Sequence, residues 1–480
     1  MGIVFYPRGG SAQVVRYLSR ALTERGHDVT VASGSLRGAE AGADARSFYS
    51  GLPLLEVDYT EAVKAFHAGG DPMSPELAVP MHPSYEDKPG VPDRAFHKVG
   101  PQQLRALVTS WRGVLSHAAA RSSFHVLHLH HLNHLHSAAL GQPSLRDAVK
   151  IAHLHGTELK MLEEMAGGNA AGPWAALWRE EMNRAAAGMD HFIAISPDNV
   201  LRALELLGLP EESVSFIPNG VDTSLFRPNR LSWEAKTGLL EDLLVRSPQG
   251  WDESGVAGSI SYERADLHAF EERTGQHKAL LLFAGRFLAF KRLPLLLEAV
   301  AKVAGAYRDH GREEPPFNLL VCGGVPGEWE GEHPHTTARR LGLRNVFFTG
   351  WLPHVQLANV INLADVFVAP SHYEPFGQVY LETMATGIPV IATRSGGPLH
   401  FVADEGSLAN GWLCKVDDVD ALAAAVMDAM SNAHERKRRG RNALELIKAE
   451  YRWPVIAGRF EELYLQLTSG PAGQRRHGHL

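Results

Sequence analysis

Short apolar runs alternate with segments whose apolar residues recur at helical spacing, from one end of the chain to the other. The first run, Ile3–Tyr6, precedes Ala12–Arg25, where valines and leucines return every three or four positions. This alternation predicts βα units that share a parallel sheet. Further strands are predicted at Val29–Ala32, Val126–Leu129, Lys150–His153, Phe192–Ile195, Val214–Ile217, Ala279–Ala284, Asn318–Val321, Val346–Thr349, Val366–Ala369 and Pro389–Thr393.

The pattern breaks near the middle of the chain. Phe216–Pro228 contains two prolines and a turn-forming Asn-Gly pair, and the polar stretch 231–276 has no clean period. We therefore predict two doubly wound α/β domains, at 1–217 and 277–450, with a linker and insertion at 218–276 and a disordered tail at 469–480. Ligands of open α/β sheets bind at the carboxyl ends of the strands, so the chemistry is expected in the loops that follow strands.

The composition narrows the class of protein. The chain has 480 residues, of which 45% are hydrophobic and 21% charged, enough for two cores. A formal net charge of -7 does not favour a nucleic-acid partner, and no apolar run is long enough for a transmembrane segment. The two cysteines are far apart and the amino terminus lacks a signal-peptide pattern, so we expect a cytoplasmic protein without disulfides.

The most distinctive segment is HYEPFGQVYLETMATGIPVIATRSGG, at His372–Gly397. Glu374 follows a predicted strand, and Glu382 comes eight positions later in the next helix. Two carboxylates at this spacing grip two groups of one extended ligand, and the helix start between them suits an anion such as a diphosphate. An ordinary loop with two chance glutamates is the alternative. The residues that open the helix are Phe376, Gly377, Gln378 and Val379.

A second group of charges follows the first predicted strand of the second half. Arg286 and Lys291 are five positions apart in this strand-to-helix loop. Two cations at this spacing converge on one diphosphate and stabilise the charge of a leaving nucleotide, without a divalent metal. A solvated basic loop is the alternative.

Together these segments resemble the Glu-x7-Glu region of the retaining GT-B glycosyltransferases of family 4, which include sucrose-phosphate synthases and bacterial glycogen synthases. The resemblance implies two Rossmann-like domains that face each other across a cleft, with a terminal helix at 451–468 that returns to the first domain. It implies that Glu374 binds the donor sugar and Glu382 the ribose. Arg286 and Lys291 would then bind the diphosphate, with backbone contacts to the donor from the start of the helix.

Weaker signals fit the same group. Gly9 and Gly10 follow the first strand, where glycines allow close approach to phosphate or sugar, although a plain tight turn is equally compatible. In AHLHGTE, His155 matches a histidine that the group places near the transferred sugar. Trp351 and Leu352 lie in GWLP, where the group reads the nucleobase, so both are assigned to donor binding, although a core position is equally compatible for Trp351.

Two other clusters receive plainer interpretations. The basic stretch His434–Arg441 is expected to be a solvated face, with contact to a membrane surface less favoured. A run of histidines in the first half suggests a metal site. However, it lacks paired cysteines or carboxylates, so neither a metal ligand nor a cofactor is expected. The run contains His125, His128, His130, His131, His134 and His136.

The resulting prediction is a retaining, metal-independent glycosyltransferase. UDP is favoured as the donor's carrier over GDP and ADP, and a small-molecule hydroxyl is favoured as the acceptor over a glycan. Alternatives are a sugar-nucleotide epimerase on the same fold and a non-catalytic nucleotide-sugar-binding protein; a glycan phosphorylase would need a pyridoxal lysine, for which no residue is a convincing candidate. The proline-rich excursion at 68–100 and the insertion at 231–276 depart from the group's pattern, and the acceptor and the oligomeric state stay open.

Overall fold

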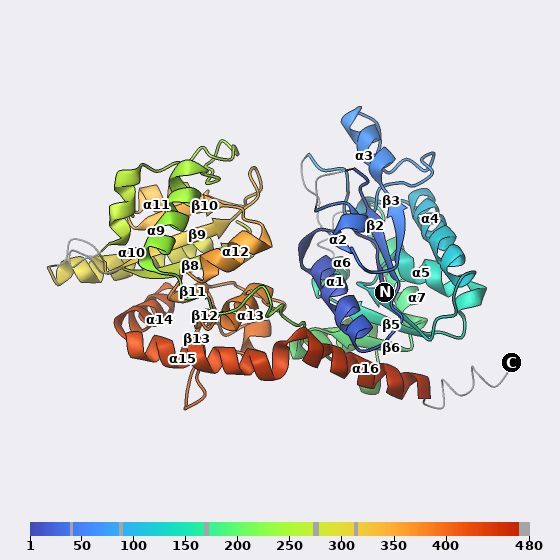
Figure 1. Ribbon diagram of the computed structural model, residues 1–480. Coiled ribbons are helices and arrows are strands. Elements are labelled where there is room, and N and C mark those ends of the chain that lie inside the picture. The colour runs from blue at the N-terminus through green and yellow to red at the C-terminus, as the bar shows by residue number, and fades with distance from the viewer. Residues whose placement is uncertain (39–41, 86–89, 168–171, 272–277, 312–314, 470–480) are drawn as a thin grey trace. The chain divides into compact units, whose positions relative to one another are not determined.

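The computed structural model describes residues 1–38, 42–85, 90–167, 172–271, 278–311 and 315–469 (Figure 1). The chain divides into two compact units, each built on a parallel sheet. Unit 1 contains residues 1–220 and the helix that begins at Trp453, and unit 2 contains residues 221–452. The prediction of two doubly wound α/β domains is therefore confirmed. The predicted disordered tail lies outside the described residues from 470 onward.

The sheet of unit 1 has seven parallel strands in the order β3-β2-β1-β4-β5-β6-β7. The strand order reverses between β1 and β4, and ligands of doubly wound sheets bind at such a switch point. The strands are β1 (Gly2–Ile3), β2 (Val31–Ser35), β3 (Leu54–Asp58), β4 (Val126–His130), β5 (Val149–Leu154), β6 (His191–Ala194) and β7 (Val214–Phe216).

Two separate cores hold the helices of unit 1 to this sheet. The terminal helix α16 (Trp453–Ser469) packs against α1 (Gly9–Glu24), and Phe460 and Leu18 belong to the core that these helices share with β5 and β6. The other core takes its apolar residues from β4 and from α4, α5 and α7. The remaining helices of unit 1 are α2 (Ala45–Phe48), α3 (Thr60–His67), α4 (Pro101–Ala119), α5 (His134–Leu140), α6 (Thr157–Ala166), α7 (Ala175–Ala187) and α8 (Pro197–Leu207).

The described part of the proline-rich excursion at 68–100 packs into unit 1. His82 is fully buried, and its ring lies edge-on to Phe5 at 5.1 Å and to Tyr59 at 5.0 Å between centroids. The carboxylate of Asp93 forms an ion pair with Arg8, the residue that precedes α1. The excursion therefore contributes to the surroundings of the loop after β1.

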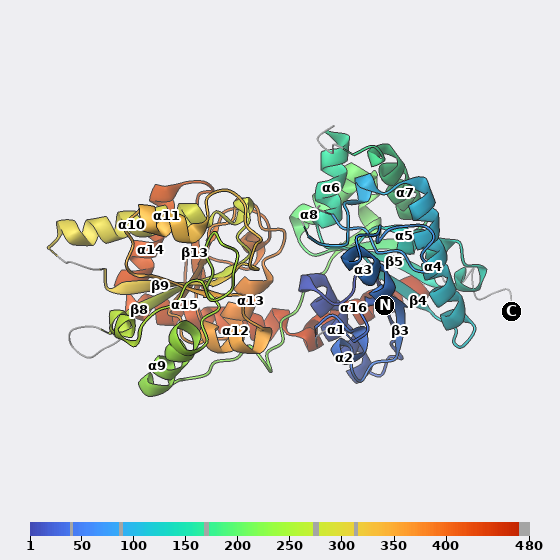
Figure 2. The same cartoon turned by 90° about the horizontal axis from the view of Figure 1, so that it is seen from above.

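The sheet of unit 2 has six parallel strands in the order β10-β9-β8-β11-β12-β13, with its switch point between β8 and β11. Figure 2 shows α10, α11 and α14 on one side of the strands and α12 and α13 on the other. The strands are β8 (Ala279–Gly285), β9 (Phe317–Gly323), β10 (Val346–Gly350), β11 (Val366–Ala369), β12 (Val390–Thr393) and β13 (Gly411–Cys414). The helices are α9 (Trp233–Glu241), α10 (Leu293–Asp309), α11 (Pro334–Arg340), α12 (His354–Ile361), α13 (Gln378–Ala385), α14 (Val419–Ser431) and α15 (Ala433–Leu446).

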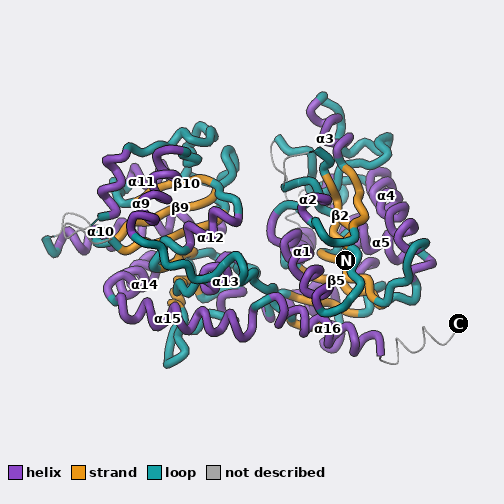
Figure 3. The backbone as a smooth tube through the Cα atoms, viewed as in Figure 1, coloured by secondary structure: helices purple, strands orange, loops and turns teal. Residues whose placement is uncertain are grey.

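The segment that the sequence sets apart as a linker and insertion belongs to unit 2 from Val221 onward. It contains α9, and then a stretch at 247–263 without helix or strand (loops are teal in Figure 3). Trp251 in this stretch is only 1% exposed, so the loop is anchored to the unit by a large buried side chain.

The basic stretch at the start of α15 differs from the solvated face predicted for it. Arg436 donates to the last carbonyls of α14 at 2.8 Å, and Arg438 donates to Ser407 O at 2.8 Å. Arg439 is largely buried, with its guanidinium 4.4 Å from the ring centroid of Trp412. These arginines hold loops of unit 2 together. Among the described helices, we find none with the length and apolar character needed to cross a bilayer.

Candidate active site

Of the predicted cations and glutamates of unit 2, Lys291 and Glu374 meet near the carboxyl ends of β8 and β11, on either side of the switch point. Arg286 and Glu382 contact other residues. Lys291 ends the short 3-10 turn after β8, and its Nζ donates to Glu374 Oε2 at 2.5 Å. Ser371 Oγ donates to the same carboxylate oxygen at 3.4 Å. Only 15% of the Lys291 side chain and 11% of the Glu374 side chain are exposed, so surrounding atoms fix this ion pair in place.

Arg286 follows β8 directly and is the more open of the two cations. Its side chain is 42% exposed, and its Nη2 lies 3.3 Å from Glu328 Oε2. Ion pairs with this much exposure contribute little free energy. An incoming anion can therefore replace Glu328 beside Arg286 at small cost.

The start of α13 lies next to Glu374. Gly377 precedes the helix with φ of 95°, a conformation that favours glycine, and a Cβ there would lie 2.7 Å from Tyr380. The first turn of any α-helix has N–H groups without an acceptor inside the helix. Here that turn contains Gln378 and Val379, and the buried Phe376 lies just before it.

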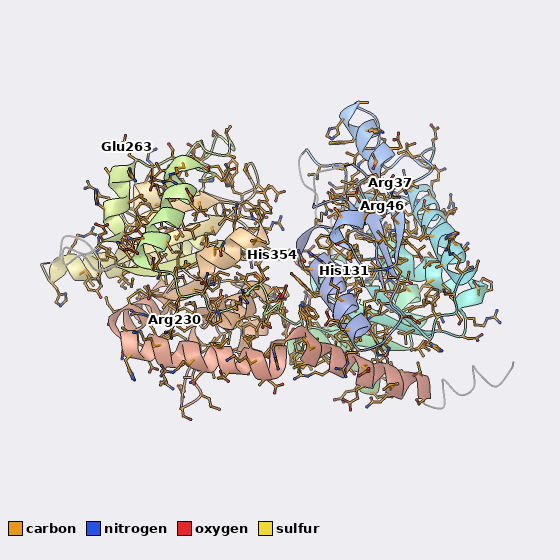
Figure 4. All side chains as sticks on the ribbon, in the orientation of Figure 1. Arg37, Arg46, His131, Arg230, Glu263 and His354 are labelled. Carbon is orange, nitrogen blue, oxygen red and sulfur yellow. The ribbon has the colours of Figure 1, made fainter. Side chains whose placement is uncertain are left out.

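Glu382 lies farther along α13 and is only 5% exposed. Burial raises the pKa of its carboxyl group to about 8. His354, labelled in Figure 4 at the start of α12, has its Nε2 3.6 Å from Glu382 Oε1. A protonated carboxyl group both donates and accepts hydrogen bonds, whereas the ionised form only accepts them. The hydrogen bonds that the Glu382 side chain can make therefore depend on pH.

The residues predicted to read a base follow an irregular strand end. The pairing of β10 with β9 shifts register between Phe348 and Gly350, a bulge of the kind that re-aims side chains beside active sites. Trp351 comes next and is 56% exposed, whereas Leu352 is buried. Trp351 thus offers a flat aromatic face to solvent near the end of β10.

In unit 1, the predicted glycines begin α1 after β1. Gly9 has φ of 69°, and a Cβ on Gly9 or Gly10 would meet no atom within 4 Å, so both face open space. The preceding Arg8 is held by its ion pair with Asp93 and by a 3.0 Å bond to Tyr6 Oη. The loop therefore combines accessible backbone with one fixed cation.

His155 stands at the end of β5, where Glu158 holds it. Its backbone N–H donates to Glu158 Oε1 at 2.5 Å, and its Nε2 lies 3.0 Å from His130 Nδ1. Glu158 is fully buried, and its Oε2 lies 3.1 Å from Nδ1 of His131, which Figure 4 labels. Burial alone would raise the pKa of Glu158, but His131 and the hydrogen bonds outweigh it and hold the pKa below 4.5.

Two members of the histidine run, His128 and His130 on β4, join His153 and His155 in a buried array at β4 and β5, whereas His134 and His136 lie on α5. His128 Nε2 lies 3.1 Å from His153 Nδ1, which gives a second hydrogen-bonded imidazole pair beside His130 and His155. Burial, reinforced by the neighbouring rings, holds the pKa of all four histidines well below 6.5, so they are neutral. Ring nitrogens of His128, His130 and His153 lie within 4.8 Å of one another. Pairing between imidazoles uses one ring nitrogen each of His130 and His153, and the Nε2 atoms of these two residues have no hydrogen-bond partner among the described residues.

Comparison with known families now places the chain. Residues 8–225 match Glycosyltransferase Family 4, and residues 266–446 match Glycosyl transferases group 1. The chain belongs to the GT-B glycosyltransferases. The resemblance stated from its motifs is therefore confirmed at the level of family and fold.

Three relatives of this glycosyltransferase match it in sequence or in fold over nearly the whole length of the chain. Glycogen synthase of Mycobacterium tuberculosis (strain ATCC 25618 / H37Rv) is 25% identical over 465 residues, which cover 96% of this chain and 92% of that protein. Sucrose-phosphate synthase from Thermosynechococcus elongatus has the same fold, with a TM-score of 0.62 at 20% identity over 98% of both chains. Anabaena HepE, solved in complex with UDP and glucose, has a TM-score of 0.59 at 15% identity over 97% of this chain and 99% of its own.

Several residues of this glycosyltransferase's site were not singled out from the sequence. Glu158 stands three positions after His155 in the quoted motif, so its position was visible although its burial was not. Asp93 and Trp251 come from segments without a recognisable motif, and His354 directly follows the GWLP motif but was not singled out. Only folding brings them to the strand ends.

Proposed function

We propose that this glycosyltransferase moves a sugar from a UDP-sugar to a hydroxyl group of a small-molecule acceptor. The anomeric configuration is retained and no divalent metal takes part. The observation that carries the proposal is the Lys291–Glu374 ion pair, which adjoins the first turn of α13 at the switch point of the unit 2 sheet.

The donor's charges suit this arrangement. Arg286 and Lys291 bind the diphosphate and stabilise the negative charge that grows on it as the bond to the sugar breaks. The start of α13 binds the same group through backbone N–H groups. Because fixed cations perform the task that a divalent metal performs in other transferases, no metal is required.

The two glutamates divide the rest of the donor. Glu374 accepts hydrogen bonds from sugar hydroxyls, and its contact with Lys291 couples sugar position to diphosphate position. Glu382 binds the ribose. The exposed face of Trp351 stacks on the base. The choice of UDP is supported by HepE, whose structure contains UDP and glucose.

Unit 1 contributes the acceptor side. His155 contacts the transferred sugar, and Gly9 and Gly10 allow close backbone approach of donor phosphate or acceptor. Retention rests on the resemblance of the Glu374–Glu382 segment to retaining enzymes. In that scheme the acceptor attacks from the face that the diphosphate leaves, and a donor phosphate oxygen takes the acceptor proton.

The proposal is tested first by ligand binding. Purified protein is heated with UDP, GDP, ADP or dTDP in EDTA, and Arg286→Ala is treated in the same way. A ligand that binds only the folded state stabilises it by about 2.7 kcal/mol at 100 times its dissociation constant. We expect a shift with UDP that is much smaller in the variant. No shift with any nucleotide would overturn the proposal.

The product decides the reaction class. Incubation with UDP-glucose and a panel of hydroxyl acceptors should give a glycoside whose anomeric proton coupling in NMR matches that of the donor. An inverted coupling would refute retention, and activity lost in EDTA but restored by Mg²⁺ would refute metal independence. Conversion of the donor sugar without an acceptor would identify an epimerase, and binding without turnover a non-catalytic protein.

A further inference from the structure

We infer that the loop at 247–262 of the insertion forms one wall of the base-binding part of the donor site, and that Gln249 is a specificity-determining residue that reads the edge of the uracil ring. This inference rests on the proposed function. It concerns a segment that departs from the family pattern, so the family motifs assign it no role.

The loop lies against the carboxyl end of β10. Gly350 has φ of 73°, and a Cβ on it would lie 2.0 Å from Gln249 O, so the two backbones are in contact. A Cβ on Gly250 would lie 2.6 Å from Phe348 O. The residues on either side of the β10 bulge therefore touch the loop. The bulge and its contact with the loop therefore lie directly before Trp351 in the chain.

Trp251 anchors the loop to the residues that follow β8 and β9. Its Nε1 donates to Gly324 O, just after β9, at 3.1 Å. Its ring stacks on Phe287, the residue after Arg286, with 5.4 Å between centroids and 25° between planes. Trp329 and His333 pack around the same indole, at 5.7 and 4.7 Å. One buried side chain thus ties the loop to the strand ends that carry the diphosphate and base residues.

Gln249 is the exposed polar residue at the contact with Gly350. Its Nε2 donates to Pro248 O at 3.1 Å, a local bond that it can exchange for one to a ligand. A side-chain amide carries both a donor and an acceptor. The imide edge of uracil presents an N–H donor beside carbonyl acceptors, so an amide next to a base stacked on Trp351 can pair with it. Stacking alone accepts any base, so Gln249 supplies the discrimination.

The test compares base recognition with diphosphate recognition in the full chain. Dissociation constants of UDP, ADP and inorganic diphosphate are measured by calorimetry for wild type and Gln249→Ala. The control is Gln102→Ala, which removes an exposed glutamine from α4 of unit 1. For Gln249→Ala we expect UDP binding to weaken about fivefold to tenfold, which is about 1–1.4 kcal/mol, with ADP and diphosphate unchanged. The control should match wild type throughout.

Two results would overturn the inference while leaving the proposed function intact. One is unchanged UDP affinity in Gln249→Ala, measured where wild type binds UDP. The other is an equal loss for UDP and diphosphate, since this would mean that the loop acts through the packing around Trp251. If wild type binds no nucleotide at all, the proposed function fails and this inference fails with it.

Discussion

The end of β5 in unit 1 holds hydrogen-bonded imidazoles beside one buried carboxylate. In unit 2, Lys291 pairs with Glu374 near the ends of β8 and β11, and Arg286, just after β8, pairs with Glu328, which follows β9. Both groups stand where open α/β sheets bind ligands. In unit 1, Glu158 is fully buried and bonded to its neighbours. In unit 2, Arg286 is partly exposed and bound to a carboxylate that a ligand can replace.

This difference indicates a division of labour. A developing negative charge is stabilised by fixed cations, and unit 2 has them at its switch point. The hydrogen-bonded rings of unit 1 offer no such cations, which fits the acceptor side that we propose for this unit. Substitutions in unit 2 should therefore change turnover and ligand affinity. Substitutions in unit 1 should act first on stability.

The largest expected effect follows from Lys291→Ala. This change removes the largely buried cation beside Glu374 and leaves that carboxylate without its ion-pair partner. Loss of one preorganised electrostatic group costs about 100-fold to 1,000-fold in kcat, or about 2.7–4 kcal/mol. Steady-state rates of sugar transfer at saturating donor measure it. Lys302→Ala is the control, because Lys302 pairs with Asp420 on the exposed surface of α10. Equal rates for both variants would remove the electrostatic role from Lys291.

The strands of unit 2 show why much of the fold was predictable. β9 lies inside the sheet, and its residues from Phe317 to Cys322 are all buried and, apart from Asn318, apolar, so the sequence there shows a short apolar run. β3 was missed because it is an edge strand, with Glu56 and Asp58 among its half-buried residues. Polar side chains on a strand that faces solvent hide it from a search for apolar runs.

The candidate site was predictable only as separate motifs. Lys291 and Glu374 are 83 positions apart. The rule that ligands bind at the carboxyl ends of strands predicts both residues in the site, but it does not predict that they form an ion pair. The insertion shows no helical or strand periodicity of apolar residues, because single buried side chains such as Trp251 attach it to unit 2. The contact of the buried Glu158 with His131, 27 positions earlier, is not visible in any local pattern. The functional roles of all these residues stay predictions.

The next largest effect is expected in unit 1, where Glu158→Gln should lower the free energy of unfolding. This change keeps the size of the side chain and one oxygen that accepts from His155 N–H, but removes the charge and replaces the oxygen that faces His131 with an NH2 group. A buried hydrogen-bonding group left unsatisfied costs about 1–3 kcal/mol, and urea unfolding at pH 7 measures the loss.

The pH dependence checks the cause of that loss. The folded-state pKa of Glu158 lies below 4.5, so its contribution is present above pH 4.5 and is lost as the pH falls through the folded pKa. Wild type and Glu158→Gln should therefore converge in stability under acid conditions. A difference that persists at all pH values would mean that shape, not charge, matters at this position.

A smaller effect is expected from the titration of Glu382. Its pKa of about 8 in the folded protein means that it is mostly protonated at pH 7. If ribose hydroxyls donate to the ionised form, binding of UDP must first remove this proton. Affinity should then rise about tenfold between pH 7 and pH 9. Protein stability should move the opposite way, falling as pH rises from 4.5 to 8, because the folded state holds the proton more tightly than the unfolded state. Calorimetry with UDP measures the affinity, and Glu382→Gln should remove its dependence on pH.

The smallest effect is expected at the exposed cation Arg286, whose ion pair, unlike that of Lys291, should compete with the ligand. Glu328→Gln keeps the shape of the side chain beside Arg286 but removes its charge. A diphosphate then no longer competes with an ion pair, and exposed pairs of this kind contribute about 0.2–1 kcal/mol. UDP affinity should therefore rise by at most about fivefold, and the gain should shrink as salt screens the pair. Dissociation constants at low and high ionic strength measure both effects. A weaker affinity in Glu328→Gln would show that Glu328 positions Arg286 for the ligand and does not compete with it. The conclusion that an anion can replace Glu328 beside Arg286 at small cost would then be wrong.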